Sequence, residues 1–105
     1  MRVLQVISSL DPGIGGPARS VAGLCRGLAA LGVETLLYVY SSQHDLVDPG
    51  AVRFIKGRGE GVRQVKQDII EIIEEYKPDL IHIHAFWSLQ NHMVAKVARR
   101  KGVPY

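Results

Sequence analysis

A chain of 105 residues, 47% hydrophobic and 22% charged, has an ordinary globular composition and room for one hydrophobic core. The formal net charge of +3 is too small to indicate nucleic-acid binding, so we expect no nucleic-acid partner. No apolar run approaches the roughly 18 residues of a membrane span, and the N-terminal MRVLQVISS turns polar too soon for a signal peptide. The single cysteine, Cys25, excludes an intrachain disulfide and favours an inert core thiol, so we expect a cytoplasmic protein.

The first third of the chain predicts a strand, a glycine-rich loop and a helix. Residues 2–8, RVLQVIS, are short, apolar and β-branched, as in a central parallel strand. The loop that follows holds three glycines in four positions. A helix then begins at Pro17 and ends at Gly32, and its apolar positions recur at helical spacing: Val21, Leu24, Cys25, Leu28 and Leu31.

The rest of the chain continues the alternation. Residues 34–40 and, more weakly, residues 51–55 predict strands on either side of a polar loop. Residues 61–76 predict an amphipathic helix with one apolar stripe, made of Val62, Val65, Ile69, Ile72, Ile73 and Tyr76. Residues 79–85, DLIHIHA, predict a fourth strand, and Ser88 caps a last helix that runs to Gly102.

This order of strands and helices predicts an α/β fold with a Rossmann-like, doubly wound parallel sheet. We expect residues 1–105 to form a single partial domain of this kind, the N-terminal part of a longer protein, because the chain stops at VPY, where a further strand would begin. In Rossmann order the first and fourth strands are neighbours, and ligands bind beyond their carboxyl ends. The glycine-rich loop leaves one of these strands and His84 ends the other, so both are expected at one crevice.

The glycine-rich loop is the first candidate ligand site. Gly13, Gly15 and Ala18 fit the G-x-G-x-x-A fingerprint only weakly, because SLDP intervenes and no acidic residue ends the second strand to hold a ribose. Gly-Lys-Ser/Thr is missing, which excludes a P-loop. Gly15 and Gly16 leave the backbone open beside a helix N-terminus, which favours an anion that Arg19 could reach. The alternative to a ligand site is that the glycines only form a turn and that Arg19 faces solvent.

The two histidines of HIH are the second candidate. By strand alternation His82 and His84 share one face, but only His44 and His92 remain as further imidazoles, so no third metal ligand is assured and we expect no metal. We interpret His82 as a hydrogen-bonded structural histidine and His84, at the end of the strand, as lining the crevice. For Trp87 two roles stay open: it packs in the core, or it forms a wall of the substrate site.

Two long stretches together resemble a known family. VLQVISSLDPGIGGPARSVAGLCRGLAALGVET and KPDLIHIHAFWSLQNHMVAKVARRKGVPY resemble the N-terminal half-domain of GT-B-fold glycosyltransferases, in particular glycosyltransferase family 4. The similarity covers nearly the whole chain. The pairing of a Gly-Gly-Pro-Ala-Arg loop with Asp-x-Ile-His-x-His-x-x-Trp is much more specific than either part alone.

The resemblance implies transfer of a sugar from a nucleotide diphosphate sugar to an acceptor hydroxyl, with retention and without an obligatory metal or other cofactor. Gly15 and Gly16 match the family's loop near the donor phosphates and acceptor, and His84 matches the histidine that faces the donor sugar. The family's second domain, with most of the nucleotide site and its paired glutamates, is not in this sequence. We therefore expect this chain alone to be inactive.

Other functions and partners stay open. The alternative function is a nucleotide- or NAD-binding module without transferase chemistry, and a third is a folding unit with no retained function. The basic segment VRFIKGRGEGVRQVK is either solvated surface or a contact with an anionic bilayer, which would place the protein peripherally at the inner face of the membrane. We also expect the isolated chain to self-associate as a two-fold dimer, joined along the exposed edge of its fourth strand or by exchange of its last helix.

Overall fold

The computed structural model describes residues 1–9, 16–41, 53–85 and 88–105, and for residues 16–19 it describes the backbone alone. Along the chain these residues form β1 (Arg2–Ile7), α1 (Gly16–Ala30), β2 (Glu34–Val39), β3 (Arg53–Lys56), α2 (Val62–Tyr76), β4 (Leu80–Ile83) and α3 (Leu89–Lys101). This order confirms the predicted alternation. The bounds differ slightly, because α1 begins one residue before Pro17 and β3 runs to Lys56.

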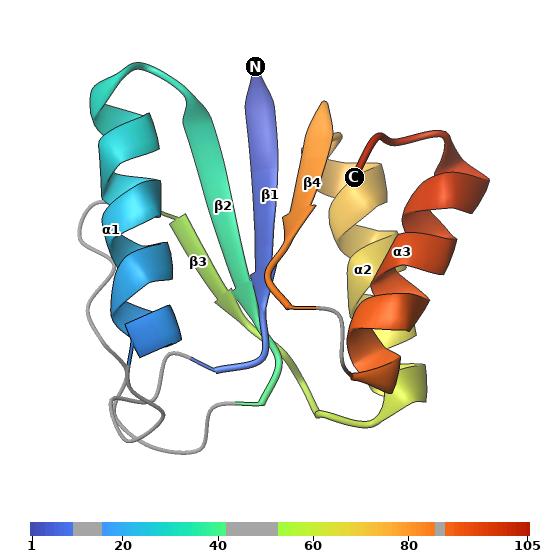
Figure 1. Ribbon diagram of the computed structural model, residues 1–105. Helices are drawn as coiled ribbons and strands as arrows, with labels where there is room; N and C mark the ends of the chain where they lie inside the picture. Colours follow the sequence, from blue (N-terminus) through green and yellow to red (C-terminus); the bar gives the residue numbers. More distant parts are fainter. Residues whose placement is uncertain (10–15, 42–52, 86–87) are drawn as a thin grey trace.

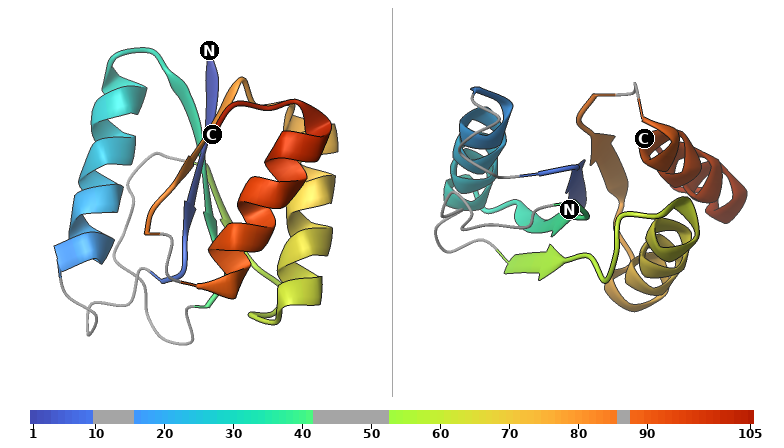
Figure 2. Two further views of the ribbon diagram at one scale, coloured as in Figure 1. Left: turned by 45° about the vertical axis from the view of Figure 1, so that its right-hand side comes forward. Right: turned by 90° about the horizontal axis from the view of Figure 1, so that it is seen from below.

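The four strands form one parallel sheet in the order β3-β2-β1-β4. β1 and β4 are neighbours as predicted, with Gln5 paired in register with His82. Helix α1 lies on one face of the sheet, and α2 and α3 lie side by side on the other (Figures 1 and 2). Parallel strands with helices on both faces make this an α/β, Rossmann-like, doubly wound fold.

The outer edge of β4 is partly occupied. The backbone N–H of Ile81 donates to the carbonyl of Pro104 at 2.9 Å, so the segment after α3 returns to the strand. This contact lies on the side of β4 away from β1. The edge through which we expect self-association therefore already has one hydrogen bond from the chain itself.

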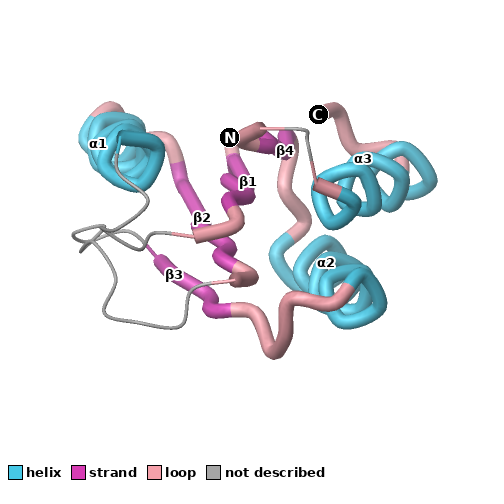
Figure 3. The backbone as a smooth tube through the Cα atoms, turned by 60° about the horizontal axis from the view of Figure 1, so that its bottom comes forward, coloured by secondary structure: helices cyan, strands magenta, loops and turns pink. Residues whose placement is uncertain are grey.

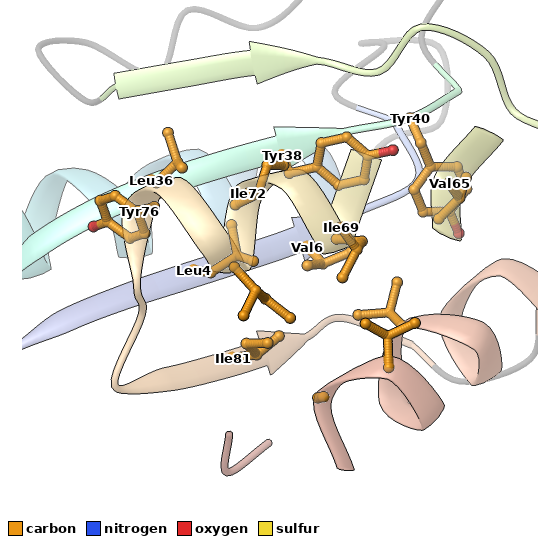
Figure 4. Packing of buried hydrophobic residues seen from close by; sticks show 14 residues of the cluster. Leu4, Val6, Leu36, Tyr38, Tyr40, Val65, Ile69, Ile72, Tyr76 and Ile81 are labelled. Atoms are coloured by element: carbon orange, nitrogen blue, oxygen red, sulfur yellow. The ribbon is translucent and has the colours of Figure 1, made fainter. Parts of the chain in front are cut away.

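The larger core lies between the sheet and helices α2 and α3 (Figure 4). Its members are Leu4, Val6, Leu36, Tyr38, Tyr40, Val65, Ile69, Ile72, Ile73, Tyr76, Ile81, Val94, Val97 and Ala98. The apolar stripe predicted for residues 61–76 forms the centre of this core, since every member except the half-buried Val62 is buried. Burial of these side chains is the main favourable term in folding of this face.

The core under α1 is smaller and corrects the predicted helix stripe. Val21 and Cys25 pack there with Ile7, Leu37 and Val39. Leu24 and Leu31, which share the stripe by spacing, are instead 37% and 82% exposed. Burial raises the pKa of the Cys25 thiol to about 11, which keeps it protonated at neutral pH, as expected for an inert core thiol.

The ends of α3 follow their sequence signals. The Ser88 hydroxyl accepts a hydrogen bond from the N–H of Asn91 at 3.1 Å, which confirms Ser88 as the N-cap. Gly102 takes the left-handed conformation at the C-cap, with φ of 72°. None of the helices in the described ranges is long and apolar enough to cross a membrane.

Candidate functional site

The predicted site residues that the structure describes lie at the carboxyl edge of the sheet. All four strands end at this edge, and each of the three helices of the described chain begins there (Figures 1 and 3). Gly16 is the first residue of α1, and Arg19 lies in its first turns. Gly15 and Trp87 lie outside the described residues, as does the side chain of Arg19. The structure therefore gives the side-chain geometry of His84 alone among the five predicted site residues.

His84 lies just past the end of β4 and is held to β1 by its backbone and its side chain. Its backbone N–H donates to the carbonyl of Val6 at 2.9 Å. Its ring Nε2 lies 2.6 Å from Oε1 of Gln5, whose side chain is 1% exposed. Because a carbonyl oxygen only accepts, this contact makes Nε2 the protonated nitrogen and leaves Nδ1 as an acceptor.

The protonation state of His84 follows from its surroundings. Burial of the ring and, to a smaller extent, the charge of the neighbouring His82 together lower its pKa to about 4. The two rings lie 4.0 Å apart between centroids, which confirms that both side chains are on one face of β4. His84 is therefore a neutral imidazole at physiological pH.

His82 differs from its predicted role. It is exposed, whereas we expected a structural histidine satisfied by hydrogen bonds. The reason is that β4 lies at the side of the sheet, and α1, the helix on this face, packs on β2. Among the described residues, no group of three or more His, Cys, Asp and Glu side chains is placed to hold a metal ion.

A hydrogen-bonded cluster follows His84, and it was not predicted from the sequence. Asn91, on the first turn of α3 and 3% exposed, donates its Nδ2 to the carbonyls of His84 at 3.1 Å and Ala85 at 2.7 Å. The Tyr40 hydroxyl donates to Oδ1 of Asn91 at 3.0 Å and lies 3.0 Å from the Ser88 hydroxyl. A polar residue on the buried side of a predicted helix was the available signal, and it was missed.

A second polar cluster fixes the turn from β3 into α2. Asp68 is 5% exposed and accepts hydrogen bonds from the Tyr38 hydroxyl at 2.8 Å, from Arg58 Nε at 2.6 Å and from Gln64 Nε2 at 3.1 Å. Burial by itself would raise the pKa of Asp68, but these hydrogen bonds outweigh it and lower the pKa. Arg58 also pairs with Glu71 at 3.0 Å. These contacts are internal to the fold.

The basic segment predicted for a membrane contact is divided by these contacts. The Arg58 guanidinium is engaged by Asp68 and Glu71, and the Arg53 guanidinium lies 5.7 Å from the centre of the Tyr76 ring. Arg53 also begins β3, so it lies at the opposite edge of the sheet from the start of α2, where Arg63 lies. The five cations of this segment therefore do not form one free cluster: they are Arg53, Lys56, Arg58, Arg63 and Lys66.

Comparison with known proteins decides the family. The sequence model described as Glycosyltransferase Family 4 matches residues 14–105, which is most of the chain. The chain belongs to Glycosyltransferase Family 4. This confirms the resemblance noted in the glycine-rich loop and the HIH strand.

Among solved structures, this member of Glycosyltransferase Family 4 is similar to the crystal structure of a glycosyltransferase from Rickettsia africae ESF-5. The likeness has a TM-score of 0.65 at 18% identity, covering 90% of this chain and 26% of that one. At that identity it supports the fold, and it agrees with the Rossmann-like sheet.

A curated relative has a different name. Over 87 residues the chain is 30% identical to "Crossover junction endodeoxyribonuclease RuvC" of Synechococcus sp. (strain RCC307), which covers 79% of this chain and 55% of that protein. The chain thus spans about half the length of this relative and about a quarter of the Rickettsia chain. Nuclease activity is the description of that protein, and the family rests on the match over residues 14–105.

Proposed function

We propose that this chain is the N-terminal, acceptor-side domain of a glycosyltransferase that moves a sugar from a nucleotide diphosphate sugar to an acceptor hydroxyl, with retention and without a metal ion. Membership of Glycosyltransferase Family 4 supports glycosyl transfer in general. The observation that carries the proposal is the neutral His84 imidazole, fixed on Gln5 at the edge of the sheet where α1 begins.

The proposed role of His84 is to bind the donor sugar near the reaction centre. With Nε2–H donated to Gln5, Nδ1 can accept a hydrogen bond from a sugar hydroxyl. A ring that stays neutral keeps this acceptor throughout the physiological pH range. The ring thereby orients a sugar hydroxyl without placing a positive charge beside a sugar whose anomeric carbon becomes cationic as the leaving group departs.

The start of α1 has the complementary role in this proposal. A departing nucleotide diphosphate develops negative charge, which backbone N–H groups at a helix N-terminus stabilise without a metal. We propose that Gly15 and Gly16 let the donor phosphates and acceptor approach this backbone, that Arg19 reaches the anion, and that Trp87 forms a wall of the substrate site.

The test compares two histidines in the complete protein. Release of nucleotide diphosphate from UDP- and GDP-sugars is measured for the wild type, for His84→Ala and for His92→Ala, whose histidine is exposed on α3. We expect His84→Ala to lower kcat by about 10²-fold or more, since positioned groups contribute on this scale, with His92→Ala near the wild type. Equal losses in both variants would contradict the role of His84.

The alternative, a nucleotide- or NAD-binding module without transferase chemistry, is separated by binding. Isothermal titration of the complete protein with NAD and with nucleotide diphosphate sugars is the measurement. The sugar nucleotides are expected to bind and NAD is not, because residues 40–42, YSS, supply no ribose-binding acid after β2. Tight binding of NAD would overturn the proposal.

We further propose a peripheral contact with an anionic membrane and self-association of the isolated chain. Lys56, Arg63 and Lys66 are the cations of the basic segment that supply the first, while Arg58 is engaged by carboxylates. Co-sedimentation with liposomes of phosphatidylglycerol at rising salt tests the membrane contact, and salt-insensitive partitioning would contradict it.

Sedimentation velocity at several concentrations tests the proposed self-association of the isolated chain. A monomer at high micromolar concentration would contradict self-association.

A further inference from the structure

The amide of Asn91 has an unusual set of partners for a buried helix residue. Both of its N–H groups are directed at backbone, with 3.1 Å to the His84 carbonyl and 2.7 Å to the Ala85 carbonyl. Its Oδ1 accepts from the Tyr40 hydroxyl at 3.0 Å. The side chain is 3% exposed, so water contributes little to satisfying it. The amide thus ties the end of β2 to the turn after β4.

The two carbonyls are the ones that bracket the Ala85 dihedral angles. The His84 carbonyl belongs to the peptide before Cα of Ala85, and the Ala85 carbonyl belongs to the peptide after it. Binding both to one side-chain nitrogen restrains φ and ψ of Ala85 together. Ala85 has φ of 68°, a left-handed conformation that residues with a Cβ adopt rarely. The unusual turn is therefore held at the point where it would otherwise relax.

This turn decides where the His84 ring lies. The backbone N–H of His84 is the last contact of this strand with β1, through the carbonyl of Val6 at 2.9 Å. Beyond it, Ala85 takes its left-handed φ, and the ring contacts Gln5 within the same short segment. A change at Ala85 would rotate the peptide of His84 and move the imidazole away from the Gln5 oxygen.

We infer that Asn91 is a positioning residue for His84: its buried amide locks the left-handed turn at Ala85 and thereby fixes the His84 imidazole on Gln5. Tyr40 assists by orienting Oδ1 of Asn91, which presents the N–H groups to the two carbonyls. The effect of Asn91 on turnover rests on the proposed function of His84. The effect of Asn91 on the position of the His84 ring is independent of that function.

The test reads the His84 ring directly by NMR titration of the full chain. Asn91→Ala removes both donors, and the loosened turn lets water reach the ring. We expect the pKa of His84 to move upward from about 4 toward the ordinary 6.5, by about one unit or more. Gln5 on β1 is uncharged, and the exposed His82 on the same strand is the charged neighbour that lowers the pKa of His84.

Tyr38→Phe is the matched control. It removes the buried hydroxyl of Tyr38 in β2, which bonds Asp68, whereas the Tyr40 hydroxyl bonds Asn91. It should lower the melting temperature while the His84 titration stays as in the wild type. A structural role of Asn91 without positioning predicts a lowered melting temperature and an unmoved titration in Asn91→Ala as well, and that result would overturn the inference.

Tyr40→Phe keeps the inference testable if Asn91→Ala does not fold. It leaves the amide in place and removes one hydroxyl, so a smaller upward shift of the same titration is expected, and no shift would contradict the inference. In the complete protein, kcat should fall in Asn91→Ala with the titration shift. A shift without loss of turnover would leave Asn91 as a positioning residue and count against the proposed function of His84.

Discussion

The two faces of the sheet are built differently. On the face of α2 and α3, fourteen buried hydrophobic residues form one cluster, and Asp68 and Asn91 anchor hydrogen-bonded groups within it. On the face of α1, five buried residues of the described chain form the cluster, and α1 packs on β2. His82 and His84 lie on this second face, where the His84 ring contacts Gln5 and His82 is exposed.

The difference separates stability from chemistry. A face with a filled core can hold backbone and side chains rigidly, because close packing leaves few alternative positions. The α1 face instead carries the His84 ring beside Gln5 of β1. The Asn91 amide joins the two faces, since it belongs to the core of α2 and α3 and bonds the carbonyl of His84, whose ring lies on the α1 face. Four experiments test the difference between the two faces.

The largest effect is expected from Asp68→Ala in the filled face. It leaves the Tyr38 hydroxyl buried without its acceptor and releases Arg58, so the free energy of unfolding should fall by about 3 kcal/mol. Urea denaturation measures it. Glu74→Ala is the control, because this exposed carboxylate of the same helix pairs with Lys101 at 3.3 Å and should cost less than about 0.5 kcal/mol. Similar costs for both would refute the distinction.

Gly57→Ala should cost somewhat less. A Cβ at Gly57 would lie 2.9 Å from Cα of Tyr40 and 3.0 Å from the Tyr38 hydroxyl, and backbone cannot give way easily, so we expect a loss of about 2 kcal/mol. In Gly27→Ala, on the exposed side of α1, the new Cβ meets nothing within 4 Å, and helix propensity should stabilise the protein by about 0.5–1 kcal/mol. Opposite signs are the expected result, and thermal unfolding measures both.

On the α1 face, the lowered pKa of His84 should make the stability of the chain depend on pH. The pKa of His84 is about 4 in the folded chain and 6.5 as the ordinary value, so the unfolded state binds more protons between these limits. Stability is therefore full above pH 6.5 and falls as the pH drops toward 4, by about 1–2 kcal/mol after allowing for solvent screening of a partly exposed ring.

His84→Gln should flatten this part of the profile, measured by urea denaturation from pH 7 to pH 4. The contribution of Asp68 lies lower, because its pKa is lowered from 3.8 and its stabilisation is lost only as the pH falls through that lower value. An unchanged slope in His84→Gln would show that His84 titrates normally in the folded chain.

The smallest effect is expected at the turn that follows α1. Leu31 is 82% exposed, so Leu31→Gln should change the free energy of unfolding by less than about 0.5 kcal/mol. Cys25→Ser in α1 places a hydroxyl in a fully buried site and should cost about 2 kcal/mol. Chemical denaturation compares them, and a large loss in Leu31→Gln would mean that the turn after α1 is covered.

The elements and their parallel arrangement could be predicted from the sequence. Alternating strands and helices favoured a parallel sheet, and Rossmann order makes the first and fourth strands neighbours. Ser88 and Gly102 marked the ends of α3 because capping depends on residues within one turn. The position of His84 just past the carboxyl end of the fourth strand followed from the same local reasoning.

Which polar groups are paired and which apolar positions are covered depended on the tertiary structure. Spacing put Leu31 on the same stripe as Cys25, but α1 ends at Ala30, so Leu31 lies exposed in the turn that follows while Cys25 is buried against β2. Asn91 acts on His84 through two carbonyls and receives its third bond from Tyr40, 51 residues away in sequence. Periodicity reports one element at a time, whereas burial and hydrogen bonding depend on which elements meet.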